Sequence, residues 1–241
     1  MRRFYATPTQ FSDKFISLEA DETRHLREVL RLREGACVQI FDGEGREFLC
    51  IIEKINKKET RLEIQREIAP PAPESDLHLT LAVSLLKGEK FDTVVQKAVE
   101  LGVTALVPLL TKRCDIKIKD AKDVEKRTER WRKIALEAAK QSGRAKLMRI
   151  EPLAEFENYI ETASGAKILF AERGGEKFSQ IEAGREITAI TGAEGGWEDS
   201  EIEAARARNV RVVTFGGRIL RAETAAITVA GILQNRFGDL N

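Results

Sequence analysis

From Leu77 onward, strand-like and helix-like segments alternate along the chain. Apolar runs at residues 104–110 and 186–191 predict buried strands, and amphipathic runs at 90–102 and 123–143 predict helices, each closed by a glycine. Because strands alternate with helices, we expect an α/β fold whose mostly parallel sheet is covered on both faces. The other elements predicted here are strands at 77–86, 166–172 and 210–215 and helices at 199–209 and 222–237.

A proline-rich stretch, IAPPAPESD at residues 68–76, precedes this region. Neither a helix interior nor a central strand tolerates its three closely spaced prolines. Before it, residues 36–64 contain short apolar runs separated by the turn sequences DGEG and NKKET, a pattern typical of β-hairpins. We therefore predict a small β-barrel over residues 1–70, a linker over residues 71–76 and an α/β domain over residues 77–241.

Composition excludes several classes of function. No apolar run approaches the roughly 20 residues of a membrane span, and no apolar stretch follows Arg2 and Arg3 to make a secretory signal. The two histidines and three scattered cysteines lack metal-ligand spacing, so we expect no metal, no membrane and a reducing cytoplasm. A net charge of +1 leaves nucleic-acid binding open, since 40 Lys and Arg residues can be distributed unevenly.

Two glycine-rich loops, GAEGG at residues 192–196 and FGG at residues 215–217, follow two successive predicted strands. Ligands of open α/β sheets bind beyond the carboxyl ends of the strands, so two such loops favour a shared pocket over coincidental tight turns. Neither loop is a dinucleotide or phosphate-loop fingerprint. We expect the glycines to leave bare backbone for a ligand, so that valine at Gly195 or Gly216 would fill the ligand's volume.

The sequences around both loops, GAEGGWEDSE and FGGRILRAETAA, resemble SPOUT-class RNA methyltransferases, specifically the ribosomal RNA small subunit methyltransferase E family. RFYATP, HLREVLRLREG, KGEKFDTVVQKAVELGVTALVPLLTKRC and RWRKIALEAAKQSGR extend the resemblance in order over nearly the whole chain. Two departures are Ala193 and Trp197, where the family has proline and phenylalanine.

The resemblance implies a PUA-like RNA-binding barrel followed by a SPOUT α/β domain with a C-terminal trefoil knot. It also implies a homodimer that uses S-adenosylmethionine to methylate N3 of one uridine, at position 1498, in the 16S rRNA of the small ribosomal subunit. Two alternatives stay open at this point. One is a non-catalytic RNA-binding assembly factor with the same fold, and the other is a nucleotide-binding metabolic enzyme of ordinary doubly wound type.

N3 methylation removes the imide proton of uridine, so a carboxylate base and a cation that stabilises the uridine anion are both useful. The resemblance places Arg221 and Glu223 beside the cofactor, and they are the candidate catalytic residues. Glu223 could equally complement the dipole of the helix that starts there. The candidate cofactor-binding residues are Phe170, Glu172, Gly192, Glu194, Gly195, Gly196, Phe215, Gly216, Arg218, Ile219, Leu220 and Thr224.

An arginine-rich run at residues 23–33 is the first candidate RNA contact. A continuous helix there would put Arg24, Arg27 and Arg31 on one stripe. Its opposite, buried side would be Leu26, Val29 and Leu30. The alternative is a solvated charged face. The complete set of candidate RNA-binding residues, chosen as cations or polar groups able to track phosphates, is Arg2, Arg3, Arg24, Arg27, Arg31, Lys87, Gln141 and Arg144.

The last predicted helix, residues 222–237, carries small and apolar residues around more of its circumference than one core-facing side requires. We therefore predict a homodimer formed through the α/β domain. The alternative is that this helix is wholly buried within its own subunit.

Overall fold

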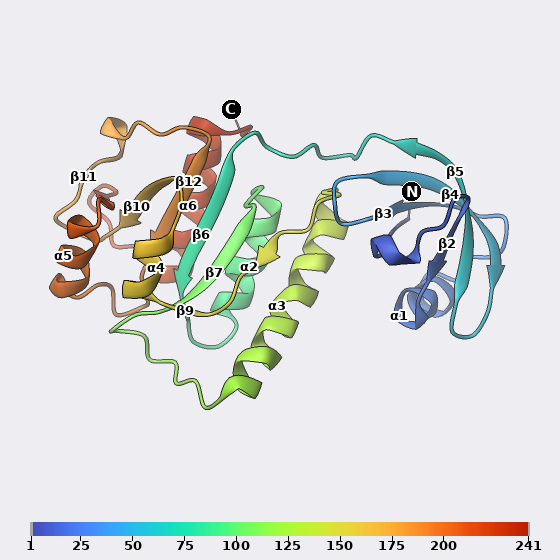
Figure 1. Ribbon diagram of the computed structural model, residues 1–241, viewed down its shortest axis with the longest axis horizontal. Coiled ribbons are helices and arrows are strands. Elements are labelled where there is room, and N and C mark those ends of the chain that lie inside the picture. The colour runs from blue at the N-terminus through green and yellow to red at the C-terminus, as the bar shows by residue number, and fades with distance from the viewer. Residues whose placement is uncertain (1, 241) are drawn as a thin grey trace. The chain divides into compact units, whose positions relative to one another are not determined.

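The computed structural model describes residues 2–240, which fold as two compact units (Figure 1). The first unit consists of Met1–Glu74 and Ala139–Leu147, and the second of Ser75–Ala138 and Met148–Asn241. The first division falls inside the proline-rich stretch. Residues 139–147, which the sequence analysis assigned to the α/β domain, are part of the first unit.

The first unit is built on one curled five-stranded sheet with the strand order β1-β3-β4-β5-β2. β1 runs parallel to β3, and every other neighbouring pair is antiparallel. Asp42 fixes the predicted hairpin turn between β3 and β4, because its Oδ1 accepts the backbone N–H groups of Glu44 and Arg46. The strands are β1 (Arg3–Tyr5), β2 (Phe15–Leu18), β3 (Cys37–Phe41), β4 (Glu47–Ile55) and β5 (Thr60–Ile68).

Alternate side chains of these strands fill the core of the first unit, as the pleat of a β-strand requires. The buried cluster includes Phe4, Ile16, Ile40 and Leu62. Burial also raises the pKa of the Cys50 thiol to about 12, so Cys50 stays protonated and acts as a packing residue.

The arginine-rich run does not form the continuous helix that the sequence predicts. Helix α1 (Ala20–Arg24) continues into one π-helical turn, η2 (His25–Val29), and Arg31 then has a φ of 52°, outside any helix. A π turn rotates the following side chains relative to an α-helix. As a result Leu26 is buried as predicted, whereas Val29 is 68% exposed, and the prediction of a buried Val29 is wrong.

The second unit contains an eight-stranded sheet in which every described pair of neighbours is parallel. The strand order is β11-β13-β10-β12-β6-β7-β8, and β9 also pairs with β7. This confirms the predicted parallel sheet. The strands are β6 (His78–Ser84), β7 (Ala105–Leu110), β8 (Arg149–Ile150), β9 (Ala154–Glu155), β10 (Ala166–Phe170), β11 (Glu176–Lys177), β12 (Glu186–Thr191) and β13 (Arg211–Thr214).

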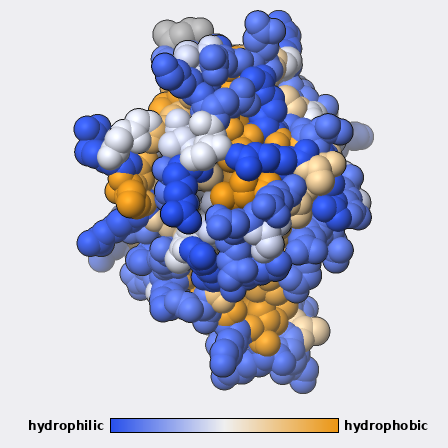
Figure 2. Space-filling model, turned by 90° about the vertical axis from the view of Figure 1, so that its left-hand side faces the viewer, coloured by the Kyte–Doolittle hydropathy of each residue, from blue (hydrophilic) through white to orange (hydrophobic). Residues whose placement is uncertain are grey.

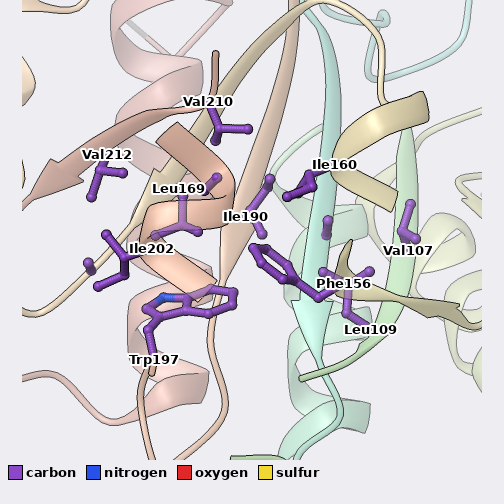
Figure 3. Packing of buried hydrophobic residues seen from close by; sticks show 13 residues of the cluster. Val107, Leu109, Phe156, Ile160, Leu169, Ile190, Trp197, Ile202, Val210 and Val212 are labelled. Atoms are coloured by element: carbon purple, nitrogen blue, oxygen red, sulfur yellow. The ribbon is translucent and has the colours of Figure 1, made fainter. Parts of the chain in front are cut away.

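Helices cover both faces of this sheet (Figure 1). On one face, α4 and α5 pack over a hydrophobic cluster in which the rings of Phe156 and Trp197 lie 5.0 Å apart (Figure 3). On the other face, α2 and α6 pack against each other. Trp131 of α3 is a core residue, buried against Phe91 of α2. The helices are α2 (Lys90–Glu100), α3 (Ala121–Ser142), α4 (Phe156–Thr162), α5 (Asp199–Ala207) and α6 (Ala222–Phe237), with single 3-10 turns η1 (Pro8–Gln10) and η3 (Phe178–Gln180).

The face drawn in Figure 2 is mostly hydrophilic, and its hydrophobic residues gather in separate patches. Among residues 2–240, no helix is both long enough and apolar enough to span a membrane.

Candidate active site

A pocket of about 360 Å³ opens beyond the carboxyl ends of β10, β12 and β13. These strands are parallel neighbours in the order β13-β10-β12, so their ends meet at one edge of the sheet. Ligands of open α/β sheets bind at such an edge, and the volume is in the range of small-molecule sites. The pocket is lined by Lys90, Phe170, Ala171, Glu172, Thr191, Gly192, Ala193, Glu194, Trp197, Phe215, Arg218, Ile219, Leu220, Arg221, Ala222, Ala225 and Val229.

Two aromatic rings form one wall of the pocket. Phe170 is the last residue of β10 and Phe215 directly follows β13, and their rings are stacked with centroids 5.0 Å apart. Phe178 packs edge-on against Phe215 at 5.4 Å and holds that ring in place. The wall offers a flat apolar surface of the kind that a planar heterocycle contacts.

The glycines of residues 192–196 are required by contacts within the protein. A Cβ on Gly192 would stand 3.0 Å from Trp197 Cε2, and one on Gly195 would stand 3.0 Å from Arg113 Cβ. A side chain at Gly195 would first meet Arg113, and the expectation that valine there fills the ligand's volume stays a prediction. Gly216 differs, since a Cβ on it would meet nothing within 4 Å.

Trp197 ties the glycine-rich loop to the neighbouring strand. Its indole Nε1 donates a hydrogen bond to the carbonyl oxygen of Phe170 over 2.9 Å, and its ring is buried against Phe156 (Figure 3). Helix α5 then begins after Glu198, its N-cap residue. The buried Glu201 carboxylate accepts the backbone N–H groups of Glu198 and Lys112. This side of the pocket is thus held by buried hydrogen bonds.

Glu194 places a negative charge at the pocket. Its carboxylate accepts hydrogen bonds from Lys90 Nζ at 3.0 Å and from the backbone N–H of Lys87 at 3.1 Å. Burial alone would raise the pKa of Glu194, but these hydrogen bonds outweigh it and hold the pKa below its ordinary value. Glu194 is therefore ionised at neutral pH, with Lys90 as its counter-ion.

Thr191 carries an unpaired polar atom in the pocket wall. It is the last residue of β12, its exposed fraction is 1%, and its Oγ1 has no hydrogen-bond partner among the described residues. A buried hydroxyl without a partner is costly and calls for an explanation. The lining position of Thr191 supplies one, since a polar ligand group in the pocket would complete its hydrogen bonding.

Most of the predicted ligand-binding residues line this pocket. Arg221, the N-cap residue of α6, is among them. Glu223 is not; its Oε2 is buried in the first turn of α6 without a partner in the described part of the chain. The predicted cofactor residues that also do not line the pocket are Gly195, Gly196, Gly216 and Thr224.

Lys90, Thr191 and Trp197 line the pocket although the sequence analysis did not include them. The sequence could have predicted Thr191 as a pocket residue, because it is a polar residue between an apolar strand and a glycine-rich loop. Lys90 had no such signal, because it reaches the pocket from a helix more than a hundred residues earlier in the chain.

The first unit uses two of the predicted RNA-binding arginines internally. Arg3 forms a two-pronged ion pair with the buried Glu47, and its Nη1 donates to the carbonyl oxygen of Ala139 at the end of α3. Arg144 is only 4% exposed and forms a two-pronged ion pair with Glu74. Their guanidinium groups therefore stabilise the first unit and are not surface cations, so a direct phosphate contact by either residue is not supported.

The other predicted RNA-binding residues are at the surface. Arg2, Arg24, Arg31, Lys87 and Gln141 are exposed, and Arg27 is half-buried. Arg24 pairs with Asp21 and Lys87 with Asp115. Arg27 pairs with Glu28. Within residues 2–240, no cluster of His, Cys, Asp and Glu side chains could hold a metal ion.

Comparison with known proteins agrees with this architecture. Residues 73–234 match the family described as RNA methyltransferase domain, and residues 18–65 match the RNA methyltransferase PUA domain. The chain is similar to the ribosomal RNA small subunit methyltransferase E of Synechocystis, with 32% identity over 92% of this chain and 74% of the relative. The enzyme of the same name from Rickettsia conorii is 30% identical over 94% of this chain and 92% of its own.

A solved structure is similar over its whole length. The ribosomal RNA small subunit methyltransferase E of Neisseria gonorrhoeae, bound to S-adenosylmethionine, matches with a TM-score of 0.91 and 31% identity, covering 100% of both chains.

Proposed function

Because the chain belongs to the ribosomal RNA small subunit methyltransferase E family, and is an S-adenosylmethionine-dependent rRNA methyltransferase, we propose that it methylates N3 of one uridine, at position 1498 of 16S rRNA. The observation that carries the proposal is the pocket at the carboxyl edge of the parallel sheet, bounded by both glycine-rich loops. This pocket is compatible with catalysis. A non-catalytic assembly factor would not need to retain such a pocket.

The pocket residues fit S-adenosylmethionine chemically. We assign the adenine ring to the wall made by Phe170 and Phe215, because a flat apolar surface suits a heteroaromatic ring. Thr191 Oγ1, which is buried and unpaired, would bind a polar atom of the cofactor. The carboxylates of Glu172 and Glu194 suit its cationic groups. When bound, the cofactor supplies an electrophilic methyl group.

Arg221 is the best-placed residue for charge stabilisation. It lines the pocket and is exposed, so its guanidinium can approach a uridine that enters from solvent. Uridine N3 must lose its proton before it can attack a methyl group, and the resulting negative charge is delocalised over the ring oxygens. We assign Arg221 to the stabilisation of that charge.

Glu223 is the candidate base for the N3 proton. Its Oε2 is buried without a partner in the described chain, two residues after Arg221. An unpaired carboxylate oxygen can accept a hydrogen bond from the N3–H group of a bound uridine. Its position in the first turn of α6 also suits a purely structural role opposite the helix dipole, so the Glu223→Gln variant described below separates the two roles.

We also propose a homodimer formed through the second unit. Ile219, at the rim of the pocket, is 84% exposed, and Leu220 beside it is also exposed. On α6, Ile227 and Ile232 are only half-buried within the chain. Covering these residues with a second copy would remove their apolar surface from water. The C-terminal trefoil knot that the resemblance implies stays a prediction.

The test is methyl transfer to defined RNA substrates. The purified chain is incubated with labelled S-adenosylmethionine and either naked 16S rRNA or small subunits lacking the modification. Mass-spectrometric mapping should find one added methyl group on N3 of the proposed uridine. Binding of RNA without measurable cofactor binding would instead favour the assembly factor, and a methyl group on another nucleotide would refute the proposed target.

A further inference from the structure

Positive charge is concentrated in one part of the second unit, residues 112–133, called here the basic segment. It contains ten Lys and Arg residues and five Asp and Glu residues, a net charge of +5 in a chain whose net charge is +1. The rest of the chain therefore carries −4. An uneven distribution of this kind marks a surface that can attract a polyanion although the whole protein is nearly neutral.

The basic segment begins beside the cofactor pocket. It follows β7, and its second residue, Arg113, donates from Nη1 to the carbonyl oxygen of Gly195 at 3.1 Å. Further along, Asp115 pairs with Lys87, which lies in the loop between β6 and α2. The segment thus extends from the glycine-rich loop that borders the site of methyl transfer.

The other end of the segment packs on α2. Trp131 stacks at an angle against Phe91 with ring centroids 4.4 Å apart, and Arg130 forms an ion pair with Asp92. The first residue of α2, Lys90, lines the cofactor pocket. Both ends of the basic segment therefore contact elements that build the pocket wall.

Three cations of α3 stand on one stripe of the helix. Lys122, Lys126 and Arg130 follow one another at i, i+4 and i+8, and all three are exposed. Like charges at this spacing destabilise a helix, and cations in its first turn oppose its dipole. The requirements of the helix itself therefore do not explain the stripe, whereas binding to an anion would relieve its repulsion.

A groove of about 250 Å³ runs beside this stripe, between α2 and α3. Lys126, Arg127 and Arg130 lie along it, and Phe91 and Trp131 supply an apolar wall. Asp123 and Asp92 pair with Arg127 and Arg130 and hold these two guanidinium groups in place. Lys122, Lys126 and Lys133 form no salt bridge within residues 2–240.

We propose that the basic segment binds backbone phosphates of the rRNA strand that flanks the target uridine. The inference rests on the proposed function and adds to it a contact surface on the second unit. Phosphate contacts supply affinity and register but no chemistry. Neutralising the segment should therefore raise the KM for RNA and weaken its salt dependence, while kcat at saturating RNA and the affinity for S-adenosylmethionine stay unchanged.

The test variant is Lys122→Gln/Lys126→Gln/Lys133→Gln, because glutamine keeps the helix propensity of lysine. The matched control, Lys177→Gln/Arg185→Gln/Arg206→Gln, removes the same charge at exposed positions on or near β11, β12 and α5, away from β7 and α3. RNA affinity is measured at several salt concentrations. The test variant should lose at least about tenfold in affinity, and its salt slope should fall by roughly 2, given about 0.7 per phosphate contact on a single strand.

Two results would overturn the inference while the proposed function stands. One is a test variant that binds RNA like the control. The other is a loss of RNA affinity accompanied by a lower mass in sedimentation, which would make the segment a subunit interface. Failure of the proposed function looks different, since the unaltered chain would then fail to methylate 16S rRNA at all.

Discussion

The carboxylate of Glu172 lies directly against Gly196, so that a Cβ on Gly196 would stand 2.2 Å from Glu172 Oε1. Gly196 also has a φ of 68°, in the left-handed region that costs other residues about 1–2 kcal/mol. We expect Gly196→Ala to lower the unfolding free energy by at least about 1 kcal/mol and to weaken cofactor binding, because Glu172 lines the pocket. Gly217→Ala is the control, since a Cβ there meets nothing within 4 Å. Calorimetry and thermal unfolding measure both effects, and equal behaviour of the two variants would contradict the packing argument.

Thr191→Val should change stability and cofactor affinity in opposite directions. Valine keeps the shape of threonine but removes the buried, unpaired Oγ1, so the unliganded protein should be as stable as the parent or slightly more so. Affinity for S-adenosylmethionine should fall about 3- to 10-fold, the equivalent of one hydrogen bond. Thr191→Ser should retain the affinity. A valine variant that binds the cofactor like the parent would mean that the hydroxyl does not contact it.

Arg221→Ala should slow methyl transfer by roughly 100-fold while cofactor affinity changes only a few-fold, which is typical of losing one transition-state electrostatic contact. Glu223→Gln should have a similar effect on rate if Glu223 is the base, and little effect if it only stabilises the start of α6. Single-turnover methylation with both ligands saturating distinguishes rate from affinity. If the Arg221→Ala variant transferred methyl at the parent rate, the role assigned to Arg221 would be wrong. Glu194 and the polar groups around it would then be the next candidates.

Arg3→Met should destabilise the first unit strongly. It would leave the carboxylate of Glu47, whose side chain is fully buried, without its partner, and breaking a buried ion pair in this way costs about 3–5 kcal/mol. The double variant Arg3→Met/Glu47→Leu should recover much of the loss, because no unpaired charge is left. Urea unfolding of the three proteins measures this. A mild effect of Arg3→Met on stability together with a large effect on RNA affinity would restore the predicted RNA contact.

Stability should depend on Glu194 in acid. The pKa of this carboxyl is lower in the folded protein than its ordinary value of 4.5. Its interactions therefore contribute fully above pH 4.5, and the contribution is lost as the pH falls through the lower, folded pKa. Without cofactor, Glu194→Gln should be less stable than the parent at about pH 6 and closer to it at about pH 3. Because the side chains of Glu194 and Lys90 are both partly exposed, we expect a modest difference, and its absence would show that this ion pair does not stabilise the fold.

Periodicity was sufficient to predict the longer strands and helices of the second unit, but it did not predict α4 or the two-residue strands β8, β9 and β11. Its strands are buried on both faces and have long apolar runs, and its helices end at glycines such as Gly102, so local sequence and tertiary position agree. The prediction of a continuous helix in the arginine-rich run was wrong because local sequence and structure do not agree there. A π turn at residues 25–29 leaves the heptad-like pattern of charges unchanged in the sequence but shifts the side chains in space, which periodicity alone cannot reveal.

The candidate site was predictable where chemistry lay in contiguous motifs. Glu194 lies in the first glycine-rich loop and Arg221 a few residues after the second, where the family resemblance made them candidates, and both line the pocket. The roles of Arg3 and Arg144 were not predictable, because a buried arginine that pairs with a glutamate looks in the sequence like one that faces solvent. The sequence also could not reveal why residues 192–196 contain glycines. Only the positions of Trp197 and Glu172 reveal that the loop packs tightly against its own protein.

The composition of the first unit has a consequence for the order of events during synthesis. Arg3 needs the carbonyl oxygen of Ala139, and Glu74 needs Arg144, so the N-terminal sheet acquires its last partners only after residue 147 has left the ribosome. Domains commonly fold from the N-terminus as they emerge. The first strands therefore stay without these partners while residues 75–138, about two fifths of the second unit, are translated.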